Sequence, residues 1–363
     1  MNDIVNRVVE RAIQIQQIPA PTFQEQKRAE FVHDLFFAEE LDDLCIDEAG
    51  NVFARWPGKG VQKPLIVSAH LDTVFPMETT LRLIRGSDLI HGPGLGDNSL
   101  GVAALFGLLW SLRDRGFQPP GDIWFVANVC EEGLGDLRGM KAVVERFGEN
   151  VQAYLVLEGL ALGHVYHRAV GVKRYRVTAR TSGGHSWSDY GQPSAVHELA
   201  KLVVELASLS LPAHPRTTMN VGRISGGTSV NVIAPEAVLD LDLRSEGQEA
   251  LTALVSAVER MIQKANRPGV SMESEVIGQR PAGELSISHP LVVLARDCLH
   301  ELRLDAGLIS GSTDANIPLS KGYPAIVLGI TTGGSAHTIH EYINTVPIAQ
   351  GMEQLVKFVS RVW

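Results

Sequence analysis

Cysteine is scarce in this sequence, with three residues among 363, namely Cys45, Cys130 and Cys298. Three well-separated thiols are too few for a disulfide framework and too scattered for a thiolate zinc site. Cys130 ends an apolar run, which favours a packed side chain over a nucleophile. The scarcity of thiols suits a reducing compartment, so we expect a cytoplasmic protein.

The sequence also lacks an excess of positive charge, since its formal net charge is -9. This balance argues against a nucleic-acid-binding surface. Residues 1–19 alternate charged and apolar residues at helical spacing, without the uninterrupted apolar core of a signal peptide. No stretch is expected to be long and apolar enough to cross a bilayer. We therefore expect neither a nucleic acid nor a membrane as a partner.

The overall composition is that of an ordinary globular protein. Apolar residues make up 45% of the chain and charged residues 20%, with no run of like charges. A chain of 363 residues is longer than a single hydrophobic core usually grows. Two domains are therefore expected.

Four short apolar runs each end at, or lead into, a potential metal ligand or acid. The runs are residues 64–70, 122–130, 154–159 and 324–330, and the polar side chains are His70, Asp72, Glu131, Glu132, Glu158 and His337. The runs are apolar at successive positions, as in strands of a parallel sheet that is covered on both faces. Residues 99–116 indicate a crossover helix between the first two. This order predicts an α/β fold with a mostly parallel sheet and a ligand site beyond the carboxyl ends of its strands.

A second pattern occupies the middle of the chain. It comprises an alternating strand, a helix, two strands, a helix and a strand, over residues 173–180, 194–209, 217–226, 229–245, 248–266 and 270–278. The order βαββαβ is typical of a ferredoxin-like α+β sandwich. We therefore expect this second domain at residues 171–282, inserted into a catalytic domain formed by residues 1–170 and 283–363.

Two imidazoles and three carboxylates form the candidate metal ligands, and the set contains no thiolate. Its members are His70, Asp97, Glu132, Glu158 and His337. This mixture suits zinc at a catalytic site with an open position. Five ligands exceed the needs of one tetrahedral ion, whereas two ions that share a carboxylate would use all five. Asp97 follows several glycines that allow close backbone approach, so we expect it to be the shared ligand.

Two further acids have separate expected roles. Asp72 lies two residues after His70 and is expected to orient its imidazole as an acceptor behind the metal. Glu131 precedes Glu132, and two adjacent carboxylates repel each other unless a cation neutralises one of them. Glu131 would then be free to act as the general base towards water.

The chain resembles a family of two-metal zinc exopeptidases and amidohydrolases that includes carboxypeptidase G, peptidase T, succinyl-diaminopimelate desuccinylase and aminoacylase. The resemblance rests on SAHLDTV, GPGLGDNSLG, CEEGLGDLRG, VLEG and AHTIHEYI, and on GGHSWSDYGQPSA, NVGRISGGTSVNVIAPEA and LDLDLRS in the inserted segment. It covers nearly the whole chain. It implies a zinc-exopeptidase-like catalytic domain and a lid domain through which two subunits pair as a homodimer.

By motif position, the resemblance implies two zinc ions per subunit, with cobalt or manganese as alternatives. His70, Asp97 and Glu158 would bind one ion, and Asp97, Glu132 and His337 the other. Glu131 falls on the general base and Asp72 on the histidine-orienting carboxylate. The resemblance also implies a cis peptide bond between Asp97 and Asn98.

Three residues of the inserted segment fall on substrate-binding positions of the family. His185 matches a histidine that reaches the substrate carbonyl, often from the partner subunit. Asn231 and Arg244 match positions that often hold polar groups or a carboxylate of the substrate, and a guanidinium suits a carboxylate because it binds in bidentate fashion. Alternatively, Arg244 forms an ordinary surface ion pair.

The expected activity is hydrolysis of an amide bond in a short peptide, as by an exopeptidase. An N-acyl amino acid amidohydrolase, or deacetylase, is the main alternative. A serine hydrolase is the rival class, because GHSWS around Ser186 approaches the GxSxG motif but lacks its last glycine. A non-catalytic peptide-binding protein would be expected to have lost ligands or the base, and this sequence retains all of them. His340 is a further candidate ligand, but the glycine-rich approach favours His337.

Overall fold

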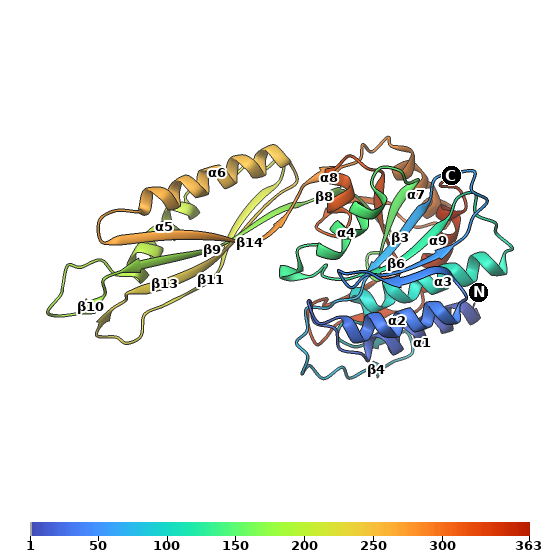
Figure 1. Cartoon of the computed structure of the whole chain (residues 1–363), viewed down its shortest axis with the longest axis horizontal. Coiled ribbons are helices and arrows are strands. Elements are labelled where there is room, and N and C mark those ends of the chain that lie inside the picture. Colours follow the sequence, from blue (N-terminus) through green and yellow to red (C-terminus); the bar gives the residue numbers. More distant parts are fainter. Residues whose placement is uncertain (1) are drawn as a thin grey trace. The chain divides into compact units, whose positions relative to one another are not determined.

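The computed structural model describes residues 2–363, which form two compact units. The first unit comprises the chain up to Ala169 together with Glu284–Trp363, and the second comprises Val170–Gly283 (Figure 1). The chain therefore leaves the first unit, builds the second and then returns to complete the first.

A nine-stranded sheet forms the centre of the first unit, in the order β1-β2-β6-β3-β7-β17-β8-β15, with β16 paired to β8. The strands are β1 (Asp42–Ile46), β2 (Val52–Trp56), β3 (Leu65–His70), β6 (Ile123–Asn128), β7 (Ala153–Glu158), β8 (His164–Ala169), β15 (Gly283–Glu284), β16 (Gly307–Gly311) and β17 (Ala325–Gly329). Strands β6, β3, β7 and β17 are mutually parallel neighbours, and they coincide with the four apolar runs. The predicted α/β class with a mostly parallel sheet is confirmed.

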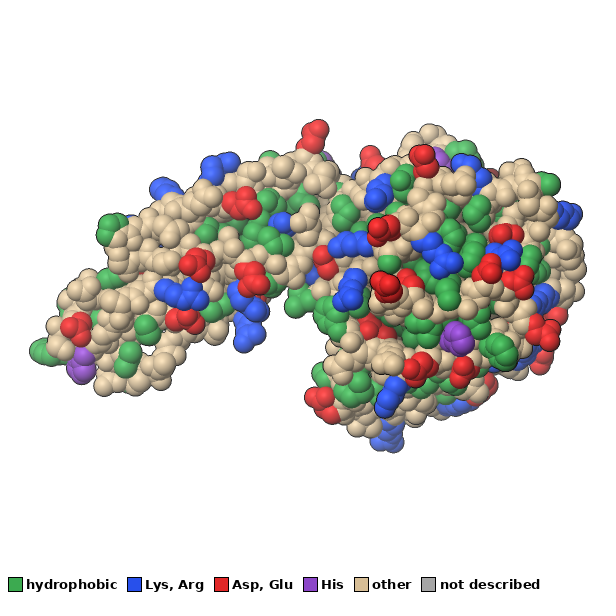
Figure 2. All heavy atoms as spheres, viewed as in Figure 1, with side chains coloured by type: hydrophobic (Ala, Val, Ile, Leu, Met, Phe, Trp, Pro, Cys, Tyr) green, Lys and Arg blue, Asp and Glu red, His purple; other side chains and the backbone are tan. Residues whose placement is uncertain are grey.

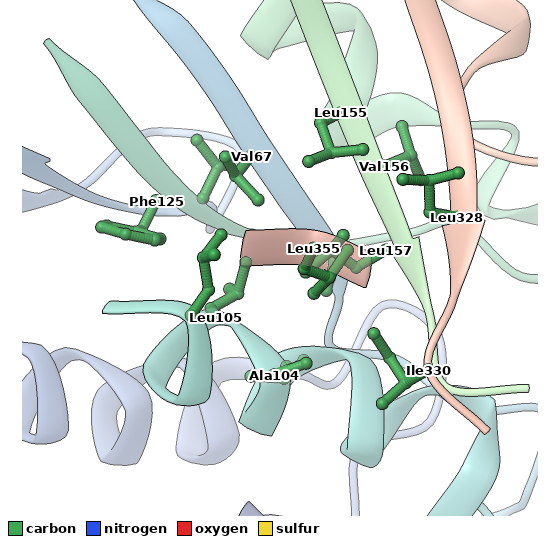
Figure 3. Packing of buried hydrophobic residues seen from close by; sticks show 14 of the residues in the cluster. Val67, Ala104, Leu105, Phe125, Leu155, Val156, Leu157, Leu328, Ile330 and Leu355 are labelled. Atoms are coloured by element: carbon green, nitrogen blue, oxygen red, sulfur yellow. The ribbon is translucent and has the colours of Figure 1, made fainter. Parts of the chain in front are cut away.

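Helices cover this sheet and bury its apolar side chains. They are α1 (Asn2–Gln16), α2 (Gln26–Ala38), α3 (Gly101–Asp114), α4 (Arg138–Phe147), α7 (Pro290–Glu301), α8 (Asn316–Ser320) and α9 (Ile348–Val359). Helix α3 packs against β3 and β7 and also contacts α1 and α9. Figure 3 shows Leu105 of α3 near Val67 and Phe125 of the sheet, and all three side chains are fully buried. Burial of one such side chain stabilises the fold by about 1.5–3 kcal/mol.

One segment of the first unit is long and apolar enough to cross a membrane, contrary to the expectation from sequence. This segment, Leu95–Asp114, combines α3 with the turn that precedes it. In the structure, 94% of its most apolar window is buried inside the protein. A helix that is apolar on all sides is typical of a position in the middle of a core, and α3 occupies such a position.

A small antiparallel sheet lies beside the carboxyl ends of the central strands. Its order is β18-β19-β5-β4, with β4 at Ile84–Arg85, β5 at Leu89–His91, β18 at Gly333–Gly334 and β19 at Tyr342–Asn344. Pairing of β19 with β5 brings the segment after β17 next to the segment before α3. The loops that carry His337 and Asp97 are thereby held together.

The second unit has a four-stranded antiparallel sheet covered by two helices. Its elements are β9 (Gly171–Thr181), β10 (Gly184–His185), α5 (Ala195–Ala207), β11 (Thr217–Gly226), β12 (Val232–Ile233), β13 (Glu236–Ser245), α6 (Gln248–Ala265) and β14 (Val270–Arg280). The sheet order is β11-β13-β9-β14, and β10 pairs separately with β12. Alternate residues of β9 and β13, such as Val177 and Leu239, are buried in one core with Leu199 of α5 and Val258 of α6.

The single strand predicted over residues 229–245 is wrong, because Pro235 separates β12 from β13. Proline has no N–H to donate to a strand ladder, which explains the break. The exposed face of β9 and β13 carries paired charges, with Arg176 Nε 2.9 Å from Asp240 Oδ1 and Arg174 Nε 2.9 Å from Asp242 Oδ1. Acidic and basic side chains lie side by side on the strands of this unit in Figure 2.

The contact between α9 and the end of β17 yields a prediction about stability. An added Cβ at Gly351 would lie 1.9 Å from the backbone oxygen of Ile330. We therefore expect Gly351→Ala to lower the free energy of unfolding by about 1–3 kcal/mol, as overpacking does. Without the clash, helix propensity alone would raise it by about 1 kcal/mol. Urea unfolding measures the sign, and Gln350→Ala, at an exposed position of the same helix, is the control.

Candidate active site

Six side chains predicted from sequence meet at the carboxyl ends of the central strands of the first unit. His70 ends β3, Glu158 ends β7, and Glu131 and Glu132 follow β6. Asp97 lies in the turn before α3, and His337 lies in the loop between β18 and β19. The parallel arrangement explains this convergence, because neighbouring parallel strands end at the same edge of the sheet.

His70, Asp97 and Glu158 form one group that could hold a metal ion, with ligand atoms within 4.8 Å of one another. His70 Nε2 lies 3.1 Å from Asp97 Oδ1 and 3.8 Å from Glu158 Oε2. Burial opposes protonation of His70, but the carboxylates of Asp72 and Asp97 raise its pKa well above the ordinary value. Burial, opposed by His70 and reinforced by neighbouring acids, raises the pKa of Glu158 well above its usual range.

Asp97, Glu132 and His337 form a second such group. His337 Nε2 lies 3.0 Å from Asp97 Oδ2 and 3.2 Å from Glu132 Oε1. These two hydrogen bonds raise the pKa of His337 to about 10. The two oxygens of Asp97 therefore face different histidines, so this carboxylate belongs to both groups.

The chemistry of the donor set fits two divalent cations. Imidazole nitrogens and carboxylate oxygens are borderline and hard ligands, as zinc, cobalt and manganese accept. Three carboxylates at one largely buried edge repel one another, and cations would remove that cost. The prediction of a cis peptide bond between Asp97 and Asn98 is confirmed.

Asp72 lies behind His70 and is completely buried. His70 Nδ1 is 3.0 Å from the backbone oxygen of Asp72 and 3.5 Å from its carboxylate, so both groups face the imidazole. The two carboxylate oxygens also accept the backbone N–H groups of Glu131 and Glu132, each at 2.9 Å. Asp72 thus connects the first histidine to the turn that carries both glutamates.

Glu131 is 5% exposed and lies beside the candidate ligands. One of its carboxylate oxygens is within 4.8 Å of ligand atoms of His70 and Glu132. Glu131 belongs to neither of the two groups that share Asp97. It can therefore serve as a base next to a ligand cluster that the other five residues complete.

Glu341 supports the loop of Asp97, and reasoning from sequence did not assign it a role. Its side chain is completely buried and accepts the backbone N–H groups of Gly94, Gly96 and Asp97 at 2.9, 2.6 and 2.9 Å. Burial raises its pKa to about 7, although these backbone donors favour the charged form. The spacing HxxxE from His337 to Glu341 is a sequence pattern that could have drawn attention to this residue.

Asn98 was also missed. Its Nδ2 donates to the backbone oxygen of Leu157 at 2.9 Å, and its Oδ1 accepts the N–H of Gly159 at 2.8 Å. The side chain thereby fixes the peptide groups on both sides of Glu158. A Cβ at Gly101 would lie 2.0 Å from Asn98 Oδ1, so a larger residue there would displace the Asn98 side chain.

The three residues predicted to bind substrate lie in the second unit. His185 in β10 is next to Asn231, because the N–H of Ser186 donates to the Asn231 backbone oxygen at 3.0 Å. Arg244 lies apart from them at the end of β13, where it pairs with Val172 of β9 and Thr218 of β11. Its Nε is 2.6 Å from Asp242 Oδ2, so Arg244 forms the ion pair weighed as the alternative.

The competing sites lack the environment that their chemistry needs. Ser186 is exposed and follows the short strand β10 of the second unit, not a buried parallel strand. Burial raises the pKa of the Cys130 thiol to about 12, which keeps it protonated and suits a packed side chain. His340 is exposed, and the metal-ligand groups found among residues 2–363 do not include it.

A comparison with protein families decides which family this arrangement represents. The model for peptidase family M20/M25/M40 matches residues 66–362. The chain belongs to this family. The predicted class of metal-dependent peptide or amide hydrolase is thereby confirmed.

Relatives and solved structures agree with membership of the M20 family. An uncharacterized protein of Bacillus subtilis, YqjE, is 22% identical to this chain, and the match covers 98% of this chain and 96% of the length of YqjE. A tripeptidase from Staphylococcus aureus superposes with a TM-score of 0.85 and 22% identity, covering 99% of this chain and 98% of that one. Aminopeptidase PepT from Bacillus cereus gives a TM-score of 0.81 at 21% identity, with the same coverage. At these identities, the structural likeness establishes the fold.

Proposed function

We propose that this M20 family chain hydrolyses the amide bond of a short peptide and acts as an exopeptidase, with Glu131 as general base. The observation that carries the proposal is the pair of ligand groups that share Asp97, with the Glu131 carboxylate beside them. Five residues suffice as ligands, so Glu131 is left for proton transfer.

The proposed site would hold two zinc ions, with His70, Asp97 and Glu158 as ligands of one and Asp97, Glu132 and His337 as ligands of the other. Bound ions would supply Lewis-acid polarisation of the scissile carbonyl and a more acidic water. Glu131 accepts the proton of the attacking water and then delivers it to the nitrogen of the leaving amine. Asp72 keeps His70 in one orientation and holds the backbone of Glu131 in place.

His185 is proposed to donate a hydrogen bond to the substrate carbonyl. Its Nδ1 accepts the backbone N–H of Trp187 at 3.2 Å, which favours the tautomer with the proton on Nε2. An exposed Nε2–H is a suitable donor for an oxygen that gains negative charge during hydrolysis. Asn231 is the neighbouring candidate for a polar group of the substrate.

The structural neighbours favour a short peptide as the substrate. The tripeptidase and PepT structures share the fold over 99% of this chain. Arg244 would favour a substrate with a free carboxylate, if its guanidinium exchanges Asp242 for that group. An N-acyl amino acid has the same scissile amide and the same carboxylate, and is therefore the alternative.

Replacement of Glu131 by glutamine tests the base. Glu131→Gln removes the proton acceptor but keeps the size of the side chain, so we expect kcat to fall by about 10²–10⁴-fold with the metal content retained. Metal analysis and steady-state kinetics are measured on the same sample. Glu145→Gln, at an exposed position of α4, is the matched control.

A zinc-loaded Glu131→Gln protein with nearly normal turnover would rule out this base. Chelation supplies an independent check, since activity should disappear and return on addition of zinc or cobalt. Activity that survives chelation and yields to a serine-directed reagent would instead support chemistry at Ser186.

A panel of substrates tests the specificity. We expect the zinc-loaded enzyme to cleave dipeptides or tripeptides faster than N-acetyl, N-succinyl or aromatic N-acyl amino acids. Arg244→Ala should chiefly raise KM for substrates with a free carboxylate and leave amide-capped forms nearly unchanged. Turnover confined to N-acyl amino acids would replace the peptidase proposal by the alternative. An equal effect on capped substrates would remove Arg244 from recognition.

We further propose a homodimer formed through the second unit, in a cytoplasmic setting. Trp187 and Tyr190, in the turn after His185, are 87% and 89% exposed. Large apolar side chains exposed together are typical of interaction surfaces, and twofold pairing is the commonest symmetric solution. The three cysteines are free thiols, which suits a reducing compartment.

Hybrid dimers test whether His185 acts on the partner subunit. A dimer of one His185→Ala chain and one Glu131→Gln chain would retain one complete site if His185 acts across the interface. We therefore expect activity in isolated hybrids, while both parent homodimers remain impaired. Sedimentation measures the oligomeric state. Hybrids without activity would place His185 in the reaction of its own subunit, whereas a fully active His185→Ala homodimer would place it outside the reaction.

A further inference from the structure

Two buried carboxylates hold the turn that carries the proposed base. The N–H of Cys130 donates to Glu25 Oε1 at 3.1 Å, and the N–H groups of Glu131 and Glu132 donate to the two oxygens of Asp72. Three consecutive backbone donors are therefore fixed by two side chains from other parts of the chain. Residues at such a turn have little freedom once all three donors are bound.

Cys130 needs this support because its backbone is in the left-handed region, with φ at 58°. A residue with a Cβ adopts that conformation at a cost, and the surroundings must stabilise it. Glu25 Oε1 accepts both the N–H and, at 3.4 Å, the thiol of Cys130. Any change in the Cys130 backbone would redirect the next residue, which is Glu131.

The side chain of Glu25 is not used to cap its own helix. Glu25 occupies the N-cap position of α2 but makes no side-chain capping hydrogen bond. Its Oε1 instead accepts the N–H of Phe23 at 3.0 Å in addition to the donors of Cys130. Glu25 is 5% exposed, so an acidic side chain is buried here without a role in the helix start.

The same segment also supports Asp72 and offsets the buried charge. Thr22 Oγ1 donates to Asp72 Oδ2 at 2.9 Å. Arg28 is 2% exposed and donates to the backbone oxygens of Ile18 and Leu71, which precedes Asp72. Burial lowers the pKa of Arg28 to about 10, against the attraction of Asp72 and Glu25, so the side chain stays charged at neutral pH. Its cation offsets the charges of both acids.

We propose that Glu25 is a positioning residue that fixes the Cys130–Glu132 turn and thereby sets the direction of Glu131. This inference rests on the proposed role of Glu131 as the base. Glu25 precedes residues 66–362, which match the family model. Glu25 thus acts through contacts with backbone N–H groups, without touching the substrate.

Two conservative variants separate the effect of the side-chain length of Glu25 from the effect of its charge. Glu25→Asp keeps the carboxylate but shortens the side chain by one methylene, so it no longer reaches the N–H of Cys130. Glu25→Gln keeps the length and one acceptor oxygen. We expect Glu25→Asp to lower kcat by about 10–100-fold with KM and metal content nearly unchanged, and Glu25→Gln to stay within about threefold of the wild type. Glu30→Asp, at an exposed position of α2, is the control.

Hydrogen exchange provides a readout that does not depend on activity. In metal-loaded Glu25→Asp, the amide of Cys130 should exchange faster, while amides within α2 keep wild-type rates. A general loss of structure would instead accelerate exchange throughout α2. In the wild type, the same amide should exchange at least about 100-fold more slowly than in an unstructured peptide. Unprotected exchange there would overturn the proposal even if Glu25→Asp fails to fold.

A double variant links Glu25 to Glu131. If Glu25 acts through the base, Glu25→Asp should cause no further loss of kcat in the Glu131→Gln background. The proposal is overturned if the two substitutions lower kcat by factors that multiply. It is also overturned if Glu25→Gln lowers kcat as much as Glu25→Asp does, or if folded Glu25→Asp has the kcat of the wild type. Should Glu131→Gln prove fully active, the proposed base is wrong, while exchange at Cys130 still reports whether Glu25 holds the turn.

Discussion

Repulsion among buried carboxylates at one edge of a parallel sheet is the constraint on which the first unit depends. Asp97, Glu132 and Glu158 converge there, and each faces an imidazole. Behind them, Glu341 and Asp72 accept backbone N–H groups. Fixed dipoles and histidines lower the cost of burying so much negative charge, and divalent cations would lower it further. The loops around the site are shaped largely by where these donors must lie.

Much of this arrangement could be predicted from sequence, because it follows local patterns. Runs of successive apolar residues mark the central strands, and the polar residue at each run's end reaches a common edge through the parallel topology. The functions of Glu25 and Asn98 could not be predicted in this way. Their side chains bind backbone groups of distant segments, and any residue with an N–H can be such a partner, so no spacing or residue type records the contact.

In the second unit, local strand geometry decides the contacts of Arg244 and the division of β12 from β13. Arg244 was selected because it matches a substrate-binding position of the family. Residues two apart on a strand share a face, however, and Asp242 lies two positions before it. The alternation along β13 could have indicated this pair. It could not have shown that Pro235 divides the preceding segment, leaving β12 to pair with β10 beside His185. The Arg244–Asp242 ion pair and the break at Pro235 both follow from local backbone geometry.

The order of strands has a consequence for synthesis of the chain. Strand β17 lies between β7 and β8, although the whole second unit separates it from them in sequence. Until residues 325–329 leave the ribosome, β7 and β8 lack a common neighbour, and long-range parallel pairing of this kind is slow to form. His337 emerges later still. A nascent chain therefore exposes an incomplete sheet edge for most of its translation, and it gains its full set of candidate metal ligands only after the second unit has been made.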